Sequence, residues 1–346
     1  MDRSNDIYQK VTDQIIAELE NGNVPWIRPW RDGEPPFPIN ALSGRPYHGI
    51  NVPLLWNSAD KQSFASDRWL TFHQVSALGG QVRRGEKSSL AVLYLPRTQE
   101  ETDALGKPLL DKDGEPKVRH FGIIREFRLF NLSQCDGLPQ SLSEPFTRPA
   151  TPVEMAEAIT MNSGVTLRHR RQSKAYYKPA TDLVMMPHPQ QFESSEAYYA
   201  TLLHELTHAT GHASRLSRPG IAGAERTEAL YAAEELVAEM GSAFLCAHCG
   251  IQGRLQHASY IGYWLDILRQ DKRAVIRASG MARHASEWLL NAIPQPCPRS
   301  AWQPTRTGSL PRREVAPLFL RINVWDSISS FSNGQKTRPM KASTLE

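Results

Sequence analysis

The sequence has few cysteines, no long apolar run and no large surplus of charge of one sign. Its 346 residues include four cysteines, Cys135, Cys246, Cys249 and Cys297, which do not have the pattern of a disulfide framework. No stretch approaches the ~20 apolar residues of a transmembrane helix. The polar N-terminus MDRSNDIYQK lacks the apolar segment of a signal peptide. We therefore expect a cytoplasmic protein with reduced thiols and no membrane partner.

The composition is that of a folded protein, with 40% hydrophobic and 22% charged residues. The length favours two domains. A stretch rich in Pro and Ser, QCDGLPQSLSEPFTRPATP, marks the boundary between them. We predict one domain over residues 1–140 and a second over residues 150–293. Residues 294–346 lose all hydrophobic periodicity and are predicted to be a poorly ordered tail.

Hydrophobic periodicity predicts an α+β fold in both halves. In the first half, apolar residues at every fourth position from Ile7 to Leu19 predict a helix, residues 67–76 a second helix, and residues 90–95 and 127–131 short strands. In the second half the predicted strands are 165–169, 175–177 and 182–186, and the predicted helices are 152–162, 195–210, 227–248, 257–279 and 281–292. The strand at 182–186 is a candidate sheet edge that would pair with an extended peptide.

The run LLHELTHATGH contains the pattern H-E-x-x-H at His204, Glu205 and His208. Residues four apart share one face of a helix, so both imidazoles can reach one metal ion. Glu205 is placed to take a proton from a metal-bound water. Apolar residues around the motif indicate a half-buried helix rather than two solvated histidines.

A third ligand is expected from the helix YAAEELVAEMGSAFL, where Glu235 and Glu239 are four residues apart. This spacing resembles the gluzincin arrangement, in which the first acid binds the metal and the second accepts the ring N–H of a ligand histidine. We predict these roles for Glu235 and Glu239, with Glu234 and Glu228 as weaker alternatives for the ligand. Two histidines and a carboxylate suit one divalent ion, zinc first and manganese as an alternative.

Two other metal patterns are weaker. His212 follows Gly211 directly, whereas the metzincin pattern needs a histidine where Ser214 stands. Cys246 and Cys249 have C-x-x-C spacing, but a closed zinc site needs two more ligands. We interpret this cysteine pair as structural.

Aromatic and cationic residues are interleaved in the first half, a mixture that is typical of surfaces for single-stranded nucleic acid. The opposing interpretation is that the aromatic residues build a small core. The candidate nucleic-acid contacts are Trp26, Arg28, Trp30, Arg31, Tyr47, Trp56, Trp69, Arg83, Arg84 and Lys87.

Longer stretches of both halves resemble the ArdC-type antirestriction proteins of conjugative plasmids. The runs SGRPYHGINVPLLW, WLTFHQVSALGGQVRRGEKS and FRLFNLSQCDGL are similar to the family's N-terminal domain, and AYYKPATDLVMMPHPQQFESSEAYYATLLHELTHATGHASRLSR with YAAEELVAEMGSAFL to its zincin-like metallopeptidase domain. The resemblance implies an N-terminal domain that binds single-stranded DNA, a metal held by residues matching His204, His208 and a downstream Glu, and protection of incoming plasmid DNA from host restriction. It covers residues 6–293.

Two functions are consistent with these patterns. In the first, the protein binds single-stranded DNA and its zincin-like domain is a metal-dependent peptidase that acts on a protein or peptide. In the second, the protein is a DNA-binding shield whose metal site is structural and does not cleave anything.

Overall fold

The structure is a computed structural model that describes residues 3–27, 33–103, 105, 107–111, 114–225, 227–253 and 260–293. The predicted tail, residues 294–346, lies outside these ranges. The helices are α1 (Arg3–Glu20), α2 (Asn51–Lys61), α3 (Phe72–Ala77), α4 (Pro152–Asn162), α5 (Ser195–Ala209), α6 (Pro219–Ala222), α7 (Glu228–Cys249), α8 (Ile261–Gln270) and α9 (Ala274–Asn291). The strands are β1 (Ile39–Asn40), β2 (Arg68–Leu70), β3 (Gln81–Val82), β4 (Ser89–Glu100), β5 (Val118–Asn131), β6 (Cys135–Asp136), β7 (Thr166–His169), β8 (Tyr176–Lys178) and β9 (Leu183–Met186). None of the described helices is both long and apolar enough to cross a bilayer.

The described residues group into two compact units. The first contains residues up to Leu93 together with residues from Ile124 onward. The second contains residues from Tyr94 to Ile123, which are the distal parts of β4 and β5 and the residues between them. The metal motif, the rest of the predicted first half and the described part of the predicted second half belong to the first unit.

The first half contains a four-stranded mixed sheet in the order β1-β2-β5-β4, and a short β3-β6 ribbon. Strand β2 is parallel to β1 and antiparallel to β5. Helix α1 confirms the predicted N-terminal helix, because Val11, Ile15 and Leu19 are buried along one of its faces.

The helix predicted over residues 67–76 is wrong. Residues 68–70 form β2, and the helix begins only after Thr71. The Thr71 hydroxyl accepts a hydrogen bond from the backbone N–H of Gln74, and the Gln74 side chain accepts one from the backbone N–H of Thr71. This reciprocal cap fixes the start of α3 and leaves the apolar residues before it to the sheet.

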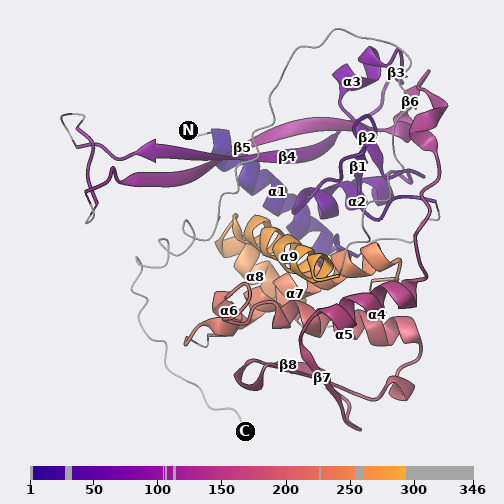
Figure 1. Cartoon of the computed structure of the whole chain (residues 1–346). Helices are drawn as coiled ribbons and strands as arrows, with labels where there is room; N and C mark the ends of the chain where they lie inside the picture. The colour runs from indigo at the N-terminus through magenta and orange to yellow at the C-terminus, as the bar shows by residue number, and fades with distance from the viewer. Residues whose placement is uncertain are drawn as a thin grey trace. The chain divides into compact units, whose positions relative to one another are not determined.

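The second half is a three-stranded sheet in the order β7-β9-β8 packed against helices. Figure 1 shows β7 and β8 on one side of α4 and α5, with α7 and α9 beyond them. The three predicted strands are confirmed to within about one residue, as are the first three predicted helices. The helix predicted over 257–279 is wrong where it is described, because α8 ends at Gln270 and α9 begins at Ala274. The predicted edge strand at 182–186 is also wrong, because β9 lies in the centre of the sheet between β7 and β8.

One hydrophobic core contains residues from both halves of the chain. The ring of Trp26 packs edge-on against Trp264, with centroids 5.6 Å apart, and Trp56 packs in the same way against Phe244, at 6.2 Å. Apolar residues of α1, α2, α7, α8 and α9 complete this cluster. The predicted boundary between residues 140 and 150 stays a prediction, and the core extends across it.

Candidate metal centre

Helix α5 places His204 and His208 one turn apart on a buried face. Ser194 caps the start of the helix, because its side chain accepts a hydrogen bond from the backbone N–H of Ala197. His204 is 1% exposed and His208 is 7% exposed, and their ring centroids are 4.8 Å apart. Glu205, the residue between them in the motif, is 5% exposed. The motif therefore lies in the interior, where two imidazoles need polar partners.

Helix α7 supplies a carboxylate to both imidazoles. The Glu235 side chain places Oε2 at 3.4 Å from His204 Nε2 and Oε1 at 3.5 Å from His208 Nε2. A close approach of α5 and α7 makes this possible. A Cβ atom on Gly241 of α7 would lie 2.5 Å from Cγ2 of Thr207 on α5, so only glycine fits at this position.

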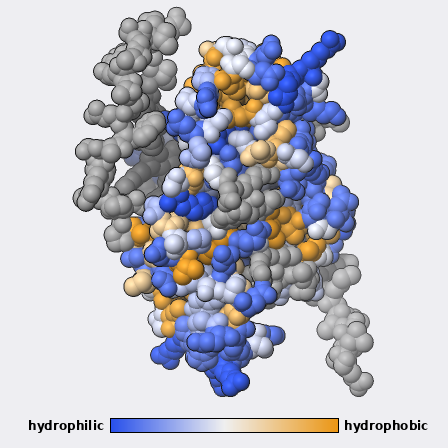
Figure 2. All heavy atoms as spheres, turned by 90° about the vertical axis from the view of Figure 1, so that its right-hand side faces the viewer, coloured by the Kyte–Doolittle hydropathy of each residue, from blue (hydrophilic) through white to orange (hydrophobic). Residues whose placement is uncertain are grey.

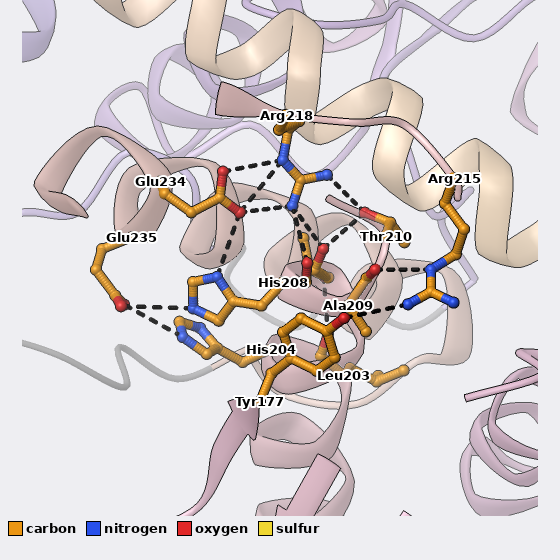
Figure 3. A network of polar contacts seen from close by, with 11 residues as sticks. Tyr177, Leu203, His204, His208, Ala209, Thr210, Arg215, Arg218, Glu234 and Glu235 are labelled. Carbon is orange, nitrogen blue, oxygen red and sulfur yellow. Dashed lines mark hydrogen bonds and ion pairs between the residues drawn. The ribbon is translucent and has the colours of Figure 1, made fainter. Parts of the chain in front are cut away.

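These three side chains form a cluster whose nitrogen and oxygen donors lie within 4.8 Å of one another. Figure 3 shows the two rings and the Glu235 carboxylate converging on one point. Two imidazoles with one carboxylate are the protein donor set of a catalytic zinc site, which leaves one coordination position open for water or substrate. The same donors accept manganese and other divalent ions. The chemistry of the site therefore fits one divalent metal ion.

A second carboxylate on α7 contacts the other nitrogen of His208. Glu234 Oε1 lies 3.3 Å from His208 Nδ1, so the contact that fixes the ring's orientation comes from Glu234. The sequence pattern alone predicts Glu234 only as a weaker alternative for the third ligand. Glu239, predicted for such an orienting role, is 2% exposed and lies one turn further along α7, and its role stays a prediction.

Arg218 holds Glu234 in place. The guanidinium donates from Nε and Nη2 to the Glu234 carboxylate at 3.0 and 2.6 Å, and from Nη1 to the Thr210 hydroxyl at 2.6 Å. Arg218 is 1% exposed, so this ion pair is buried (Figure 3). The sequence offered no signal for this residue, because it lies in the segment before α6 and outside any metal motif.

The two carboxylates change the protonation of His208 in the metal-free site. Burial alone lowers the pKa of His208, but hydrogen bonds and charge attraction from Glu234 and Glu235 outweigh it and raise the pKa to about 10. A protonated ring must release a proton before Nε2 can bind a metal ion. The proton and the metal therefore compete for the same nitrogen.

We expect metal affinity to rise about tenfold per pH unit between pH 6 and 9, because binding releases one proton from His208. Titration calorimetry in buffers of different ionisation enthalpy measures the released protons directly. A proton release near zero at pH 7, with affinity independent of pH, would show that His208 is neutral before the metal binds.

Replacing Glu235 by Ala is expected to weaken metal binding by more than about 100-fold, because changes to residues that merely orient ligands already cost 10–100-fold. Glu234→Ala is expected to fall in that smaller range. Metal content after dialysis, measured by mass spectrometry, compares both variants with Glu228→Ala, an exposed acid on the same helix. Full metal retention by Glu235→Ala would remove it from the ligand set.

The remaining sequence candidates do not join the cluster. His212 pairs with the Ser214 hydroxyl at 2.8 Å and Glu228 is exposed. Cys246 and Cys249 are buried free thiols, and burial raises the pKa of Cys246 to about 12. This agrees with their interpretation as structural residues.

Most of the aromatic residues predicted to contact nucleic acid belong to the core. Trp26 and Trp69 are fully buried and Trp56 is 1% exposed, so none of the three rings offers a face to a base. Tyr47 is half-buried beside the cluster that contains Trp69. Burial therefore corrects the prediction of base stacking at these tryptophans, since core packing explains them.

The cationic candidates differ among themselves. Arg83 is exposed but pairs with Glu86 and Asp136. Arg84 and Lys87 are exposed. Arg28, Trp30 and Arg31 lie outside the described residues.

Two family models match the chain. Residues 5–130 match the N-terminal domain of anti-restriction factor ArdC, and residues 154–281 match a zincin-like metallopeptidase. The fold and the His204–His208–Glu235 cluster thus belong to a zincin-like metallopeptidase domain preceded by an ArdC-type domain.

Solved structures and other relatives identify the family. The crystal structure of the antirestriction protein ArdC from the R388 plasmid, in its metal-free form, is 36% identical with a TM-score of 0.69 and covers 83% of this chain and 98% of that chain. The Mn(II)-bound structure of ArdC from the same plasmid is 34% identical with a TM-score of 0.66 and the same coverage. The uncharacterised protein y4eC of Sinorhizobium fredii (strain NBRC 101917 / NGR234) is 38% identical over 82% of this chain and 91% of its own length. This chain belongs to the ArdC antirestriction family.

Longer proteins also contain a region similar to this chain. A DNA primase TraC of Escherichia coli is 39% identical over 293 residues, which are 82% of this chain but 27% of the primase. The chain thus spans about a quarter of that relative's length.

Proposed function

We propose that this protein binds single-stranded DNA and protects incoming plasmid DNA from host restriction, with a metal-dependent peptidase as its second half. The observation that carries the peptidase part is the buried cluster of His204, His208 and Glu235 with Glu205 in the same motif. Membership of the ArdC family supports the antirestriction part. We keep the boundaries of 1–140 for the DNA-binding domain and 150–293 for the zincin-like domain as part of this proposal, together with a cytoplasmic location.

In the proposed reaction each residue has one task. His204, His208 and Glu235 would hold the ion, and Glu234 would keep the His208 ring in the tautomer that presents Nε2 to it. When bound, a divalent ion polarises the scissile carbonyl and lowers the pKa of a water molecule. Glu205 would accept the proton of the attacking water and return it to the leaving amine.

The second candidate is a DNA-binding shield whose metal site is structural. Three buried ligands bind a metal whether or not a peptide reaches it. The relatives described above are named as antirestriction proteins, DNA primases and an uncharacterised protein, and none of them is named as a peptidase. These names support a DNA-binding shield with a structural metal site as the second candidate function.

The experiment that separates the two candidates uses His204→Ala in the full chain. Protection of transferred DNA from a restriction enzyme and binding of a labelled single-stranded oligonucleotide are measured side by side. The peptidase proposal expects unchanged DNA binding and loss of protection. If the variant protects DNA as well as the wild type, the shield is the function.

A further inference from the structure

The outer side of the β7-β9-β8 sheet is strongly cationic. Residues 158–181 contain five cations and no acidic residue. Three of the cations, Arg170, Arg171 and Lys174, lie in the segment between β7 and β8, and the other two lie in the strands. All five are exposed, and none of them makes an ion pair within the described ranges of the chain. The nearest following acid, Asp182, is already paired with Arg215.

The strand register places an aromatic ring among these cations. Arg168 of β7 and Tyr176 of β8 are both paired with Met185 of the central strand, so the three residues form one row across the sheet. Thr166 and Lys178 form the next row, on either side of Leu183. Because neighbouring strands lie about 4.8 Å apart, Arg168 and Lys178 lie within about 10–12 Å of each other on this face.

The two faces of this sheet differ in burial. Val184 and Met186 are fully buried on the face that packs into the core with α5. Side chains alternate along a strand, so Arg168, Tyr176 and Met185 lie on the opposite face. There Tyr176 is 44% exposed and Met185 is half-buried. Figure 2 shows hydrophilic residues gathered at the lower end of the view, where Figure 1 places β7 and β8.

We propose that this outer face, together with the segment of residues 170–174, binds single-stranded DNA. The unpaired cations would contact successive phosphates, and the Tyr176 ring would stack on an unpaired base. A duplex keeps its bases stacked inside, so the ring favours a single strand. The inference rests on the DNA binding in the proposed function, but it assigns a contact surface to the zincin-like half, whereas Trp26, Trp56 and Trp69, predicted for that task in the first half, are buried.

The first test changes the charge. The full-length variant Arg170→Gln/Arg171→Gln/Lys174→Gln is titrated against fluorescein-labelled oligo(dT) and oligo(U), with anisotropy recorded at several salt concentrations. Each phosphate contact with a single strand contributes ~0.7 to the slope of log affinity against log salt. The loss of three contacts is therefore expected to reduce that slope by about 2. Affinity at 0.1 M salt is expected to fall roughly tenfold or more. Tighter binding of oligo(U) than of oligo(dT) would overturn single-stranded DNA as the ligand.

The second test changes the ring. Tyr176→Ala is expected to weaken binding roughly 5- to 150-fold, the range for loss of one stacked base, whereas Tyr176→Phe is expected to bind like the wild type. An unchanged affinity for Tyr176→Ala would overturn the stacking platform. Equal binding of duplex DNA through the same residues would overturn its preference for single strands.

A control in the first half separates this inference from the proposed function. Arg84→Gln/Lys87→Gln removes two exposed cations that the sequence predicted as DNA contacts. If this control loses binding while the β7–β8 variants keep it, the inference fails and the proposed DNA binding stands. If the wild-type protein binds no single strand, the proposed DNA binding itself fails.

Discussion

Glu205→Gln is expected to reduce peptide cleavage by about 10²–10⁴-fold while metal content stays unchanged, which is the range for loss of a general acid–base group. Glutamine has the same shape as glutamate but cannot take a proton from the attacking water. Glu205 is 5% exposed on α5, so no solvent base replaces it easily. Cleavage of an unfolded protein such as casein is followed by mass spectrometry, and bound metal is measured on the same samples.

The matched control for this change is Glu196→Gln, which lies in the first turn of the same helix and is exposed. We expect it to cleave like the wild type. Cleavage by Glu205→Gln at the wild-type rate would remove Glu205 from the reaction. A wild-type protein that binds metal and cleaves nothing under the same conditions would favour the shield.

Arg218→Met is expected to lower the free energy of unfolding by about 3–5 kcal/mol, because it leaves the buried Glu234 carboxylate without its cation. The loss is predicted from burial, since Arg218 is 1% exposed and Glu234 is 5% exposed. Attraction to Arg218 and contact with His208 keep the pKa of Glu234 below its usual range despite the opposing effect of burial. Urea denaturation of the metal-free protein measures the change.

An exposed ion pair provides the comparison. Arg269 and Glu20 are paired at 2.7 Å with about half of each side chain exposed. Arg269→Met is expected to change stability by no more than about 1 kcal/mol. If the two Met variants unfold at the same urea concentration, the buried pair does not stabilise the fold in the way proposed.

Most of the metal cluster could be predicted from the spacing of residues along the sequence. The spacing of His204 and His208 places both on one helix face, and Glu235 lies on the next long helix, which packs against the first. The roles of Arg218 and Glu234 could not be predicted in the same way. Their contact depends on how the segment before α6 folds back over α5. No local sequence pattern predicts the path of that segment.

The burial of the aromatic residues in the first half could not be predicted from the local sequence. A tryptophan beside arginines has the same local sequence whether its ring is on the surface or in the core. Trp26 and Trp56 are buried because residues more than 180 positions away, Trp264 and Phe244, pack against them. Tyr176 lies between Lys174 and Lys178 in the sequence, but only the strand register shows that Arg168 lies in the same row of the sheet.

The core that joins Trp26 to Trp264 and Trp56 to Phe244 also bears on how such a protein can be inherited. A recombination event between the two halves would separate large apolar rings from their partners and expose them to water. A fragment of that kind is prone to aggregate. We therefore expect neither half to fold stably without the other, and the region of the much longer TraC primase that is similar to this chain extends over 293 residues.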